Sequence, residues 1–251
     1  MKLPIDKILR RLADTYEHRV LRKKPVPFGW AARLSKFEHE ATEREWQLLM
    51  YYQEMISKVQ ELPGDVAEFG VAGGCSFLAF ARCLRVMERG FDRKEHRRLI
   101  GFDSFEGLPP LTDQDTAAHA NAKQMKEGGF HSPHLYAPLF EFVEAEPHCS
   151  LVRGWFDESV PKFLSDNPHS SFALIHIDCD LYESTKVVLD LLWDRVVPGG
   201  IVLFDELFHK DYPGETLAFR EFSRQHSKDF ALRRSKVKPD KKYLVKLEPT
   251  A

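Results

Sequence analysis

The sequence predicts a single α/β domain built around a doubly wound, mostly parallel β-sheet. From residue 65 onward, short apolar runs alternate with longer helical stretches, and polar residues follow directly after several of these runs. The chain has 251 residues, 43% of them hydrophobic, which is enough for one large core but not for two. We therefore expect one domain over residues 1–251, with a core over 63–251 that follows a helical N-terminal extension over 1–62.

The elements can be predicted in order along the chain. The extension is amphipathic, is broken at Pro25, Pro27 and Gly29, and contains its clearest helix from about Thr42 to Gln60. The five expected core strands are Val66–Phe69, Leu99–Phe102, Ser150–Val152, Phe172–Ile177 and Ile201–Phe204. Two later apolar runs, Phe230–Leu232 and Tyr243–Leu247, flank the basic stretch Arg233–Lys242 and predict a closing antiparallel hairpin.

One long polar segment, residues 111–148, lies between the second and third expected strands and contains Gly128 and Gly129. Connections of this length inside a compact domain are commonly binding insertions or lids, and disorder is the alternative. We predict a lid or insertion here.

Charge and cysteine content restrict the function. Lys and Arg number 36 against 38 Asp and Glu, so overall charge gives no attraction to nucleic acid or to an acidic membrane surface. The four cysteines show neither C-x-x-C pairing nor zinc-site spacing, which favours reduced thiols in the cytoplasm. No stretch approaches the roughly 20 apolar residues of a membrane span. We expect a small-molecule ligand and neither a nucleic-acid nor a membrane partner.

The end of the first expected strand carries a glycine loop. The pattern is E-x-G-x-x-x-G from Glu68 through Gly70 to Gly74, and the following helix begins near Cys75 and Ser76. Glycines here let backbone N–H groups approach a ligand at a helix N-terminus. A dinucleotide fingerprint would need glycine where Ala72 stands, which disfavours an NAD(P)-dependent oxidoreductase. A glycine turn that serves only tight packing is the alternative.

Two further strand ends suit a nucleoside. Asp103 follows the second strand, where a carboxylate can accept hydrogen bonds from both hydroxyls of a ribose. Trp155 or Phe156, after the third strand, could cover an adenine ring, although either aromatic could instead belong to the core.

Acidic residues follow the fourth and fifth strands. Asp178, Asp205 and Glu206 should meet at the same edge of the sheet, and no Lys or Arg is close to them in the sequence. Since such acids repel one another, we expect a cation among them: Mg²⁺, or Mn²⁺ or Ca²⁺, given all-oxygen ligands. Helix capping is the alternative, and it would fully account for Asp180 before a helix near Tyr182.

This arrangement suits methyl transfer to a hydroxyl group. A metal would hold the hydroxyl and lower its pKa, and a nearby base would remove the proton. Asp180 and His209 are the base candidates, with Asp178 completing the predicted catalytic set. His176 is expected to point into the sheet interior.

With these residues in place, the sequence resembles the macrocin O-methyltransferase (TylF-type) family over roughly Pro63 to Phe222. The resemblance is carried by the phrases PGDVAEFGVAGG, GFDSFEGLP, VRGWFDESVP and HIDCDLYEST, and by PGG followed by the acidic pair. It implies a Rossmann-like class I methyltransferase fold. It also implies metal-dependent methyl transfer from S-adenosylmethionine to a hydroxyl, commonly on a sugar of a natural product, and a homodimer.

The resemblance also implies residue roles. It assigns Glu68, Gly70, Ser76, Asp103 and Ser104 to the cofactor, and Asp178, Asp205 and Glu206 to the metal. We add Gly74 and Trp155 to the cofactor set, and we count Asp178 there as well. The family usually has two aspartates after the fifth strand, so Glu206 is a departure that puts the metal ligand set in question.

Other functions remain as alternatives. A carboxyl, amine or peptide could be the methyl acceptor in place of a hydroxyl. A non-catalytic protein with the same fold would have no reason to keep mutually repelling acids, which argues against that possibility.

Overall fold

The computed structural model describes residues 43–89, 97–116 and 125–249. The chain divides into two compact units, residues 1–46 and 47–251. The described part of the first unit, residues 43–46, belongs to the first turns of helix α3 (Glu43–Val59). The predicted extension before residue 43 lies outside the described residues, and the division into extension and core stays a prediction.

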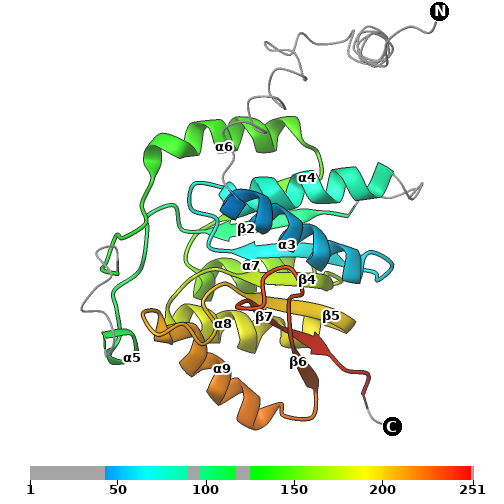
Figure 1. Cartoon of the computed structure of the whole chain (residues 1–251). Coiled ribbons are helices and arrows are strands. Elements are labelled where there is room, and N and C mark those ends of the chain that lie inside the picture. The colour runs from blue at the N-terminus through cyan, green and yellow to red at the C-terminus, as the bar shows by residue number, and fades with distance from the viewer. Residues whose placement is uncertain (1–42, 90–96, 117–124, 250–251) are drawn as a thin grey trace, which may run out of the picture. The chain divides into compact units, whose positions relative to one another are not determined.

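A seven-stranded sheet forms the centre of the second unit (Figure 1). Its strands are β1 (Asp65–Phe69), β2 (Leu99–Asp103), β3 (Cys149–Arg153), β4 (Phe172–Ile177), β5 (Val196–Phe204), β6 (Phe230–Arg234) and β7 (Lys242–Lys246). The helices after α3 are α4 (Cys75–Arg89), α5 (Asp113–Thr116), α6 (Pro133–Ala145), α7 (Phe156–Asp166), α8 (Tyr182–Leu192), the 3₁₀ turn η1 (Trp193–Arg195) and α9 (Pro213–Gln225).

The strand order confirms the predicted fold class. The order is β3-β2-β1-β4-β5-β7-β6, with β1 to β5 parallel and β7 antiparallel to both β5 and β6. The chain direction across the sheet reverses between β1 and β4, so the loops after these two strands diverge and leave a crevice. The C-terminal hairpin of β6 and β7 is the antiparallel addition that the sequence predicted.

Helices cover both faces of the sheet (Figure 1). Helices α3, α4 and α6 contribute to one apolar cluster, which includes Tyr52, Phe80 and Leu139. Helices α7, α8 and α9 contribute to the other, which includes Val188 and Phe222. Because strand side chains alternate between faces, β1 sends Val66 into the first cluster and Phe69 into the second. This three-layer packing fixes the strand ends that carry the polar residues.

The described part of segment 111–148 is largely helical. Helix α5 is short, and helix α6 leads back to β3, so it forms the crossover between the parallel strands β2 and β3. Gly128 and Gly129 lie in a turn that pairs with Leu108: the Leu108 N–H donates to the Gly129 carbonyl at 2.9 Å, and the Gly128 N–H donates to Leu108. The predicted lid role stays a prediction.

A second arrangement connects helix α3 to the C-terminal hairpin. The carboxylate of Glu54 accepts hydrogen bonds from Ser235 Oγ at 2.6 Å and from the N–H groups of Lys236 and Val237. These three donors begin the turn between β6 and β7, which returns to the sheet at Lys242. The conformation of this turn is therefore set by a residue far away in sequence. No helix among the described residues is both long and apolar enough to cross a membrane.

Candidate active site

A pocket of about 700 Å³ lies where β1, β2, β4 and β5 end. It is the crevice expected at the reversal of strand order. Its wall includes these polar residues from the predicted set: Gly70, Ser76, Asp103, Ser104, Trp155, Asp178, Asp180, Asp205 and Glu206. Nine of the twelve site residues predicted from the sequence therefore lie around one cavity, together with residues that were not predicted.

The glycine loop begins with a close contact between two strand ends. Gly70 has φ +93°, and a Cβ on it would lie 1.9 Å from the carbonyl oxygen of Asp178. The N–H of Asp178 in turn donates to the Phe69 carbonyl at 2.9 Å. Only glycine fits this position, because the conformation is left-handed and the space is filled by backbone. The contact holds the start of the glycine loop against the first residue after β4.

Asp103 organises the adjacent wall. One carboxylate oxygen accepts the Ala72 N–H at 2.8 Å and the other accepts the Phe105 N–H at 2.6 Å. Asp103 therefore fixes both the glycine loop and its own loop. Since each carboxylate oxygen can accept more than one hydrogen bond, this use leaves capacity for ribose hydroxyls on the pocket side.

Helix α6 closes the outer side of the glycine loop. A Cβ on Gly73 would meet Leu135, and one on Gly74 would meet Leu139, which is 1% exposed. Tyr136 of the same helix lines the pocket with Phe130 from the preceding loop. Sequence reasoning missed this aromatic wall, since it treated residues 111–148 as one polar segment.

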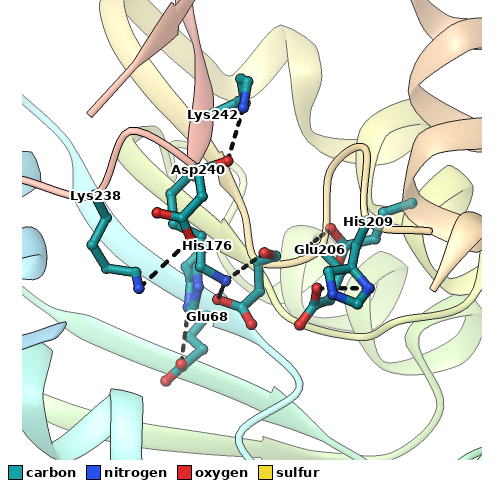
Figure 2. A network of polar contacts seen from close by, with 10 residues as sticks. Glu68, His176, Glu206, His209, Lys238, Asp240 and Lys242 are labelled. Carbon is teal, nitrogen blue, oxygen red and sulfur yellow. Dashed lines mark hydrogen bonds and ion pairs between the residues drawn. The ribbon is translucent and has the colours of Figure 1, made fainter. Parts of the chain in front are cut away.

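Three predicted residues do not reach the pocket wall. Gly74 packs against Leu139, and His209 is exposed beside the pocket, with Nδ1 3.7 Å from the carboxylate of Glu206. Glu68 is fully buried beneath helices α3 and α4, where its carboxylate lies 3.0 Å from Nδ1 of the equally buried His176 (Figure 2). The structure thus places His176 in the interior, as predicted, and places Glu68 there as well, outside the pocket wall; the role of Glu68 toward the cofactor stays a prediction.

The Glu68–His176 pair carries unused polar atoms. Oε2 of Glu68 and Nε2 of His176 have no hydrogen-bond partner among the described residues. With Asp178, these side chains form the one group of His, Cys, Asp or Glu in the described residues whose ligand atoms all lie within 4.8 Å of one another. The ligand atoms of the predicted trio, Asp178, Asp205 and Glu206, therefore do not all lie within this distance of one another.

The acids on the pocket wall perturb one another. Burial, and then the carboxylates of Asp205 and Asp180, raise the pKa of Asp178 well above its ordinary value. Burial, followed by Glu206 and Asp205, raises the pKa of Asp180 to about 7. Burial and Asp205 likewise raise the pKa of Glu206. Negative charge is therefore concentrated on this wall.

The expectation that no Lys or Arg compensates these acids is wrong. Lys241, from the turn before β7, donates from Nζ to Oδ1 of Asp205 at 2.6 Å and also to the Asp205 main-chain carbonyl. Burial raises the pKa of Asp205, but the Lys241 ammonium, the His176 side chain and the hydrogen bonds with Lys241 and Glu206 together hold that pKa below its ordinary value. Lys241 lies in the basic stretch Arg233–Lys242, which was predicted only as part of the closing hairpin, and the structure brings its side chain into contact with Asp205 of the pocket wall.

A buried glutamate supports the turn after β5. Oε2 of Glu215, at the start of α9, accepts the Glu206 N–H at 2.9 Å, whereas Oε1 has no partner among the described residues. Burial first, and then Asp180 and Asp205, raise the pKa of Glu215 well above its ordinary value. Glu215 was not predicted, because a single glutamate in a helical stretch carries no distinguishing pattern.

Asp180 is not a helix cap. Helix α8 has Leu181 as its N-cap residue without a side-chain hydrogen bond, and the Tyr182 N–H is accepted by Oδ1 of Asp115 at 2.8 Å. Asp180 itself adopts φ +60°, an uncommon conformation for a residue other than glycine. The capping alternative therefore does not explain Asp180, whose side chain is left to the pocket.

The acidic side chains have the right chemistry to bind a divalent cation, but their carboxylates are not already gathered around one point. Asp178, Asp205 and Glu206 line one wall and offer only oxygen, which hard cations such as Mg²⁺ prefer. Raised pKa values at Asp178 and Glu206 indicate a deficit of positive charge that a divalent ion would relieve. Asp205 already has a cationic partner in Lys241.

A comparison with known protein families shows to which family the chain belongs. The sequence profile of the macrocin-O-methyltransferase (TylF) family matches residues 44–234, which is more than half of the chain. The chain belongs to the macrocin-O-methyltransferase family. The match begins within helix α3 and ends with strand β6, so it includes every strand end that forms the pocket.

Curated relatives of this TylF-family chain are named as O-methyltransferases. It is 33% identical over 153 residues to the 8-demethyl-8-(2,3-dimethoxy-alpha-L-rhamnosyl)-tetracenomycin-C 4'-O-methyltransferase of Streptomyces olivaceus, covering 58% of this chain and 53% of that protein. It is 28% identical over 152 residues to the mycinamicin III 3''-O-methyltransferase of Micromonospora griseorubida, covering 58% and 56%. The chain thus spans about half the length of the curated relatives it matches.

Solved structures show the same architecture. The crystal structure of CalS11, a calicheamicin methyltransferase, superposes with a TM-score of 0.75 at 27% identity and covers 98% of this chain and 94% of that one. The O-methyltransferase NovP, at 22% identity and a TM-score of 0.62, covers 80% of each chain and supports the fold alone. The TylF-family chain therefore has the class I methyltransferase fold that its sequence predicted.

Proposed function

We propose that this chain is an S-adenosylmethionine-dependent O-methyltransferase that acts on a hydroxyl group of a small molecule. One observation carries the proposal: a single pocket has the glycine loop and Asp103 on one wall and the acids Asp178, Asp180 and Glu206 on another. The first wall suits a nucleoside cofactor, and the second suits removal of a proton from an acceptor. Family membership supports this assignment.

The cofactor wall acts by binding and orientation. The loop from Gly70 to Gly73 lines the pocket at the N-terminus of α4, where free N–H groups favour a carboxylate. Asp103 is placed for the ribose, and Trp155 and Phe156 both line the pocket where an adenine ring would pack. S-adenosylmethionine, when bound, supplies a methyl group already activated by a sulfonium, so alignment is the main requirement.

Asp180 is our proposed general base. Its pKa of about 7 lets it be ionised at neutral pH while still holding a proton once it has accepted one. His209, the other base predicted from the sequence, is exposed and is linked to the pocket through Glu206. Geometry therefore favours Asp180, with Asp178 beside it.

We propose that Asp178, Asp205 and Glu206 would hold a divalent ion, most suitably Mg²⁺. A bound ion there would lower the pKa of an acceptor hydroxyl. Glu206 is kept in place from behind by its N–H bond to Glu215. This turn positions the longer glutamate side chain where the family usually has aspartate.

The names of the relatives suggest the acceptor class. The tetracenomycin relative is named for 4'-O-methylation of a compound that carries a rhamnosyl group, and the mycinamicin relative is named for 3''-O-methylation. We therefore propose a sugar hydroxyl, or a hydroxyl of a glycosylated natural product, as the acceptor here. We also propose a cytoplasmic homodimer; the free state of all four cysteines supports the compartment, and light scattering would test the assembly.

Calorimetric titration tests the cofactor. The purified chain should bind S-adenosylhomocysteine and should not bind NADH in a parallel titration. Binding of NADH in place of S-adenosylhomocysteine would overturn the proposal and restore the oxidoreductase alternative. Acceptor screening of glycosides, amines and carboxylic acids, with labelled S-adenosylmethionine and with or without Mg²⁺, then separates the acceptor alternatives and tests the metal requirement.

Asp103→Ala tests the ribose assignment. Loss of a charged hydrogen-bond acceptor costs about 1.5–3 kcal/mol, so affinity for S-adenosylhomocysteine should fall by about 10- to 100-fold. Asp166→Ala is the control, because Asp166 is an exposed partner of Lys162 at the end of α7 and does not line the pocket. Equal affinity of the two variants would remove Asp103 from the cofactor site.

A further inference from the structure

Lys241 contacts the acidic wall, the part of the pocket lining formed by Asp178, Asp180, Asp205 and Glu206. The proposed function gives this lysine no role. Its Nζ contacts both Oδ1 and the main-chain carbonyl of Asp205, and the two side chains are only 12% and 22% exposed. The other lysines near this turn face elsewhere: Lys238 pairs with the Asp240 carboxylate, and Lys242 donates to the Asp240 carbonyl (Figure 2). Lys241 is thus distinguished from its neighbours by its direct contact with the acidic wall.

The main chain at Lys241 is held in place by contacts that do not involve Asp205. The Ser235 N–H donates to the Lys241 carbonyl at 3.1 Å, and the Lys241 N–H donates to the Lys238 carbonyl at 2.9 Å. Ser235 is itself fixed by Glu54 of helix α3. The backbone that carries Lys241 is therefore built into the fold, and the ammonium is delivered to Asp205 rather than attracted there by chance.

The remaining acids have no equivalent cation. Among the ion pairs of the described residues, none joins Asp178 to a Lys or Arg, and Glu206 has only the His209 imidazole at 3.7 Å. A divalent ion on Asp205 would have to share that carboxylate with an ammonium, and like charges a few ångströms apart inside a protein repel strongly. The same ion on Asp178 and Glu206 would meet carboxylates that have no direct ion pair with a Lys or Arg among the described residues.

We propose that Lys241 is the resident counter-ion of Asp205 and that it weakens divalent-ion binding at the acidic wall, leaving Asp178 and Glu206 as the principal ligands. This inference rests on the metal site of the proposed function. It makes Lys241 a positioning residue that holds Asp205 and sets the metal affinity, rather than a residue that touches the reacting atoms.

Mn²⁺ titration of the metal-stripped full chain tests the inference. In calorimetry, Lys241→Met should bind Mn²⁺ at least about tenfold more tightly than the unmodified chain, because the competing charge is gone. Lys241→Arg should stay within about threefold of it, since the charge is kept. Lys242→Met is the matched control: it removes the same charge from the adjacent position without touching Asp205, and it should leave the Mn²⁺ affinity unchanged.

A second pair of variants tests the division of ligands. Asp178→Asn should weaken Mn²⁺ binding far more than Asp205→Asn, which removes a carboxylate that is already neutralised. Lys241→Gln provides a variant that keeps a hydrogen-bond donor for Asp205 should the methionine variant fold poorly, and it should show the same tightening.

Several outcomes would overturn the inference. These are Mn²⁺ affinity that is unchanged or weaker in both Lys241→Met and Lys241→Gln, equal tightening in Lys242→Met, or no Mn²⁺ binding by any variant. Titration of the same samples with S-adenosylhomocysteine separates this failure from a failure of the methyltransferase proposal. If the methyltransferase proposal were wrong, neither the unmodified chain nor any variant would bind S-adenosylhomocysteine.

Discussion

Replacement of Gly70 by alanine tests the contact that joins the glycine loop to the acidic wall. The added Cβ would lie 1.9 Å from the Asp178 carbonyl oxygen, whereas ordinary contact begins near 3.4 Å, so the two strand ends must separate by about 1.5 Å (3.4 − 1.9). The obstructing atom belongs to the backbone and cannot rotate away as a side chain could. Relief therefore requires movement of Asp178 itself.

The magnitude follows from three costs. A left-handed conformation costs alanine about 1–2 kcal/mol relative to glycine. Separation of the strand ends breaks or weakens the bond from the Asp178 N–H to Phe69, worth about 1 kcal/mol, and overpacking adds about 1–3 kcal/mol. We expect Gly70→Ala to lower the free energy of unfolding by about 3–6 kcal/mol, a large fraction of the 5–15 kcal/mol typical of a folded domain.

Gly128→Ala is the matched control. Gly128 also has a positive φ, +70°, but a Cβ there would have no atom within 4 Å. An alanine at this position therefore adds only the cost of the left-handed conformation and no steric clash. Urea unfolding, followed by tryptophan fluorescence and circular dichroism, measures both variants, and Gly128→Ala should lose only about 1–2 kcal/mol. If Gly70→Ala were no less stable than Gly128→Ala, the close approach of β1 and β4 described here would be wrong.

Two other substitutions probe the outer wall and the proposed base. Leu139→Ala leaves a cavity between α6 and the glycine loop. It should lower the free energy of unfolding in urea by about 2–5 kcal/mol and weaken the binding of S-adenosylhomocysteine. Unchanged binding would show that α6 does not support the loop. Asp180 has a folded-state pKa of about 7, above its unfolded value, so its protonated form is favoured in the fold and stability is lost as pH rises through about 7. The metal-free chain should therefore be more stable at pH 5 than at pH 8 by roughly 3 kcal/mol from this group, because about two pH units of that interval lie below its folded-state pKa. Asp180→Asn, which tolerates the same positive φ, should reduce that dependence in thermal or urea unfolding, and a slope equal to that of the unmodified chain would contradict the assignment.

Much of the fold could be predicted because its signals are local in the sequence. Each strand of the parallel sheet is a short apolar run, and the run Phe172–Ile177 was located to the residue because it is buried on both sides and has clear polar limits. The reversal of strand order then follows from the alternation of strands and helices. Pocket residues that directly follow a strand, such as Asp103 and Asp178, were found for the same reason.

Residues whose contacts join distant parts of the sequence could not be predicted in this way. Lys241 enters the site from a hairpin turn, and a basic turn has the same pattern whether its lysines face water or a carboxylate. Glu68 was assigned to the cofactor from its place in a motif, but strand alternation turns it toward helices α3 and α4 and the buried His176. The signal that could have been used is its register partner, since Glu68 and His176 pair directly across β1 and β4.

The bond between Ser235 and Glu54 has a consequence for the order of events during synthesis. Its partners are 181 residues apart, so the turn that carries Lys241 can dock only after the chain has been made through that turn. Until then Asp205, which is made 36 residues earlier than Lys241, has no ammonium beside it. The acidic wall of a nascent chain is therefore more negative than that of the finished protein.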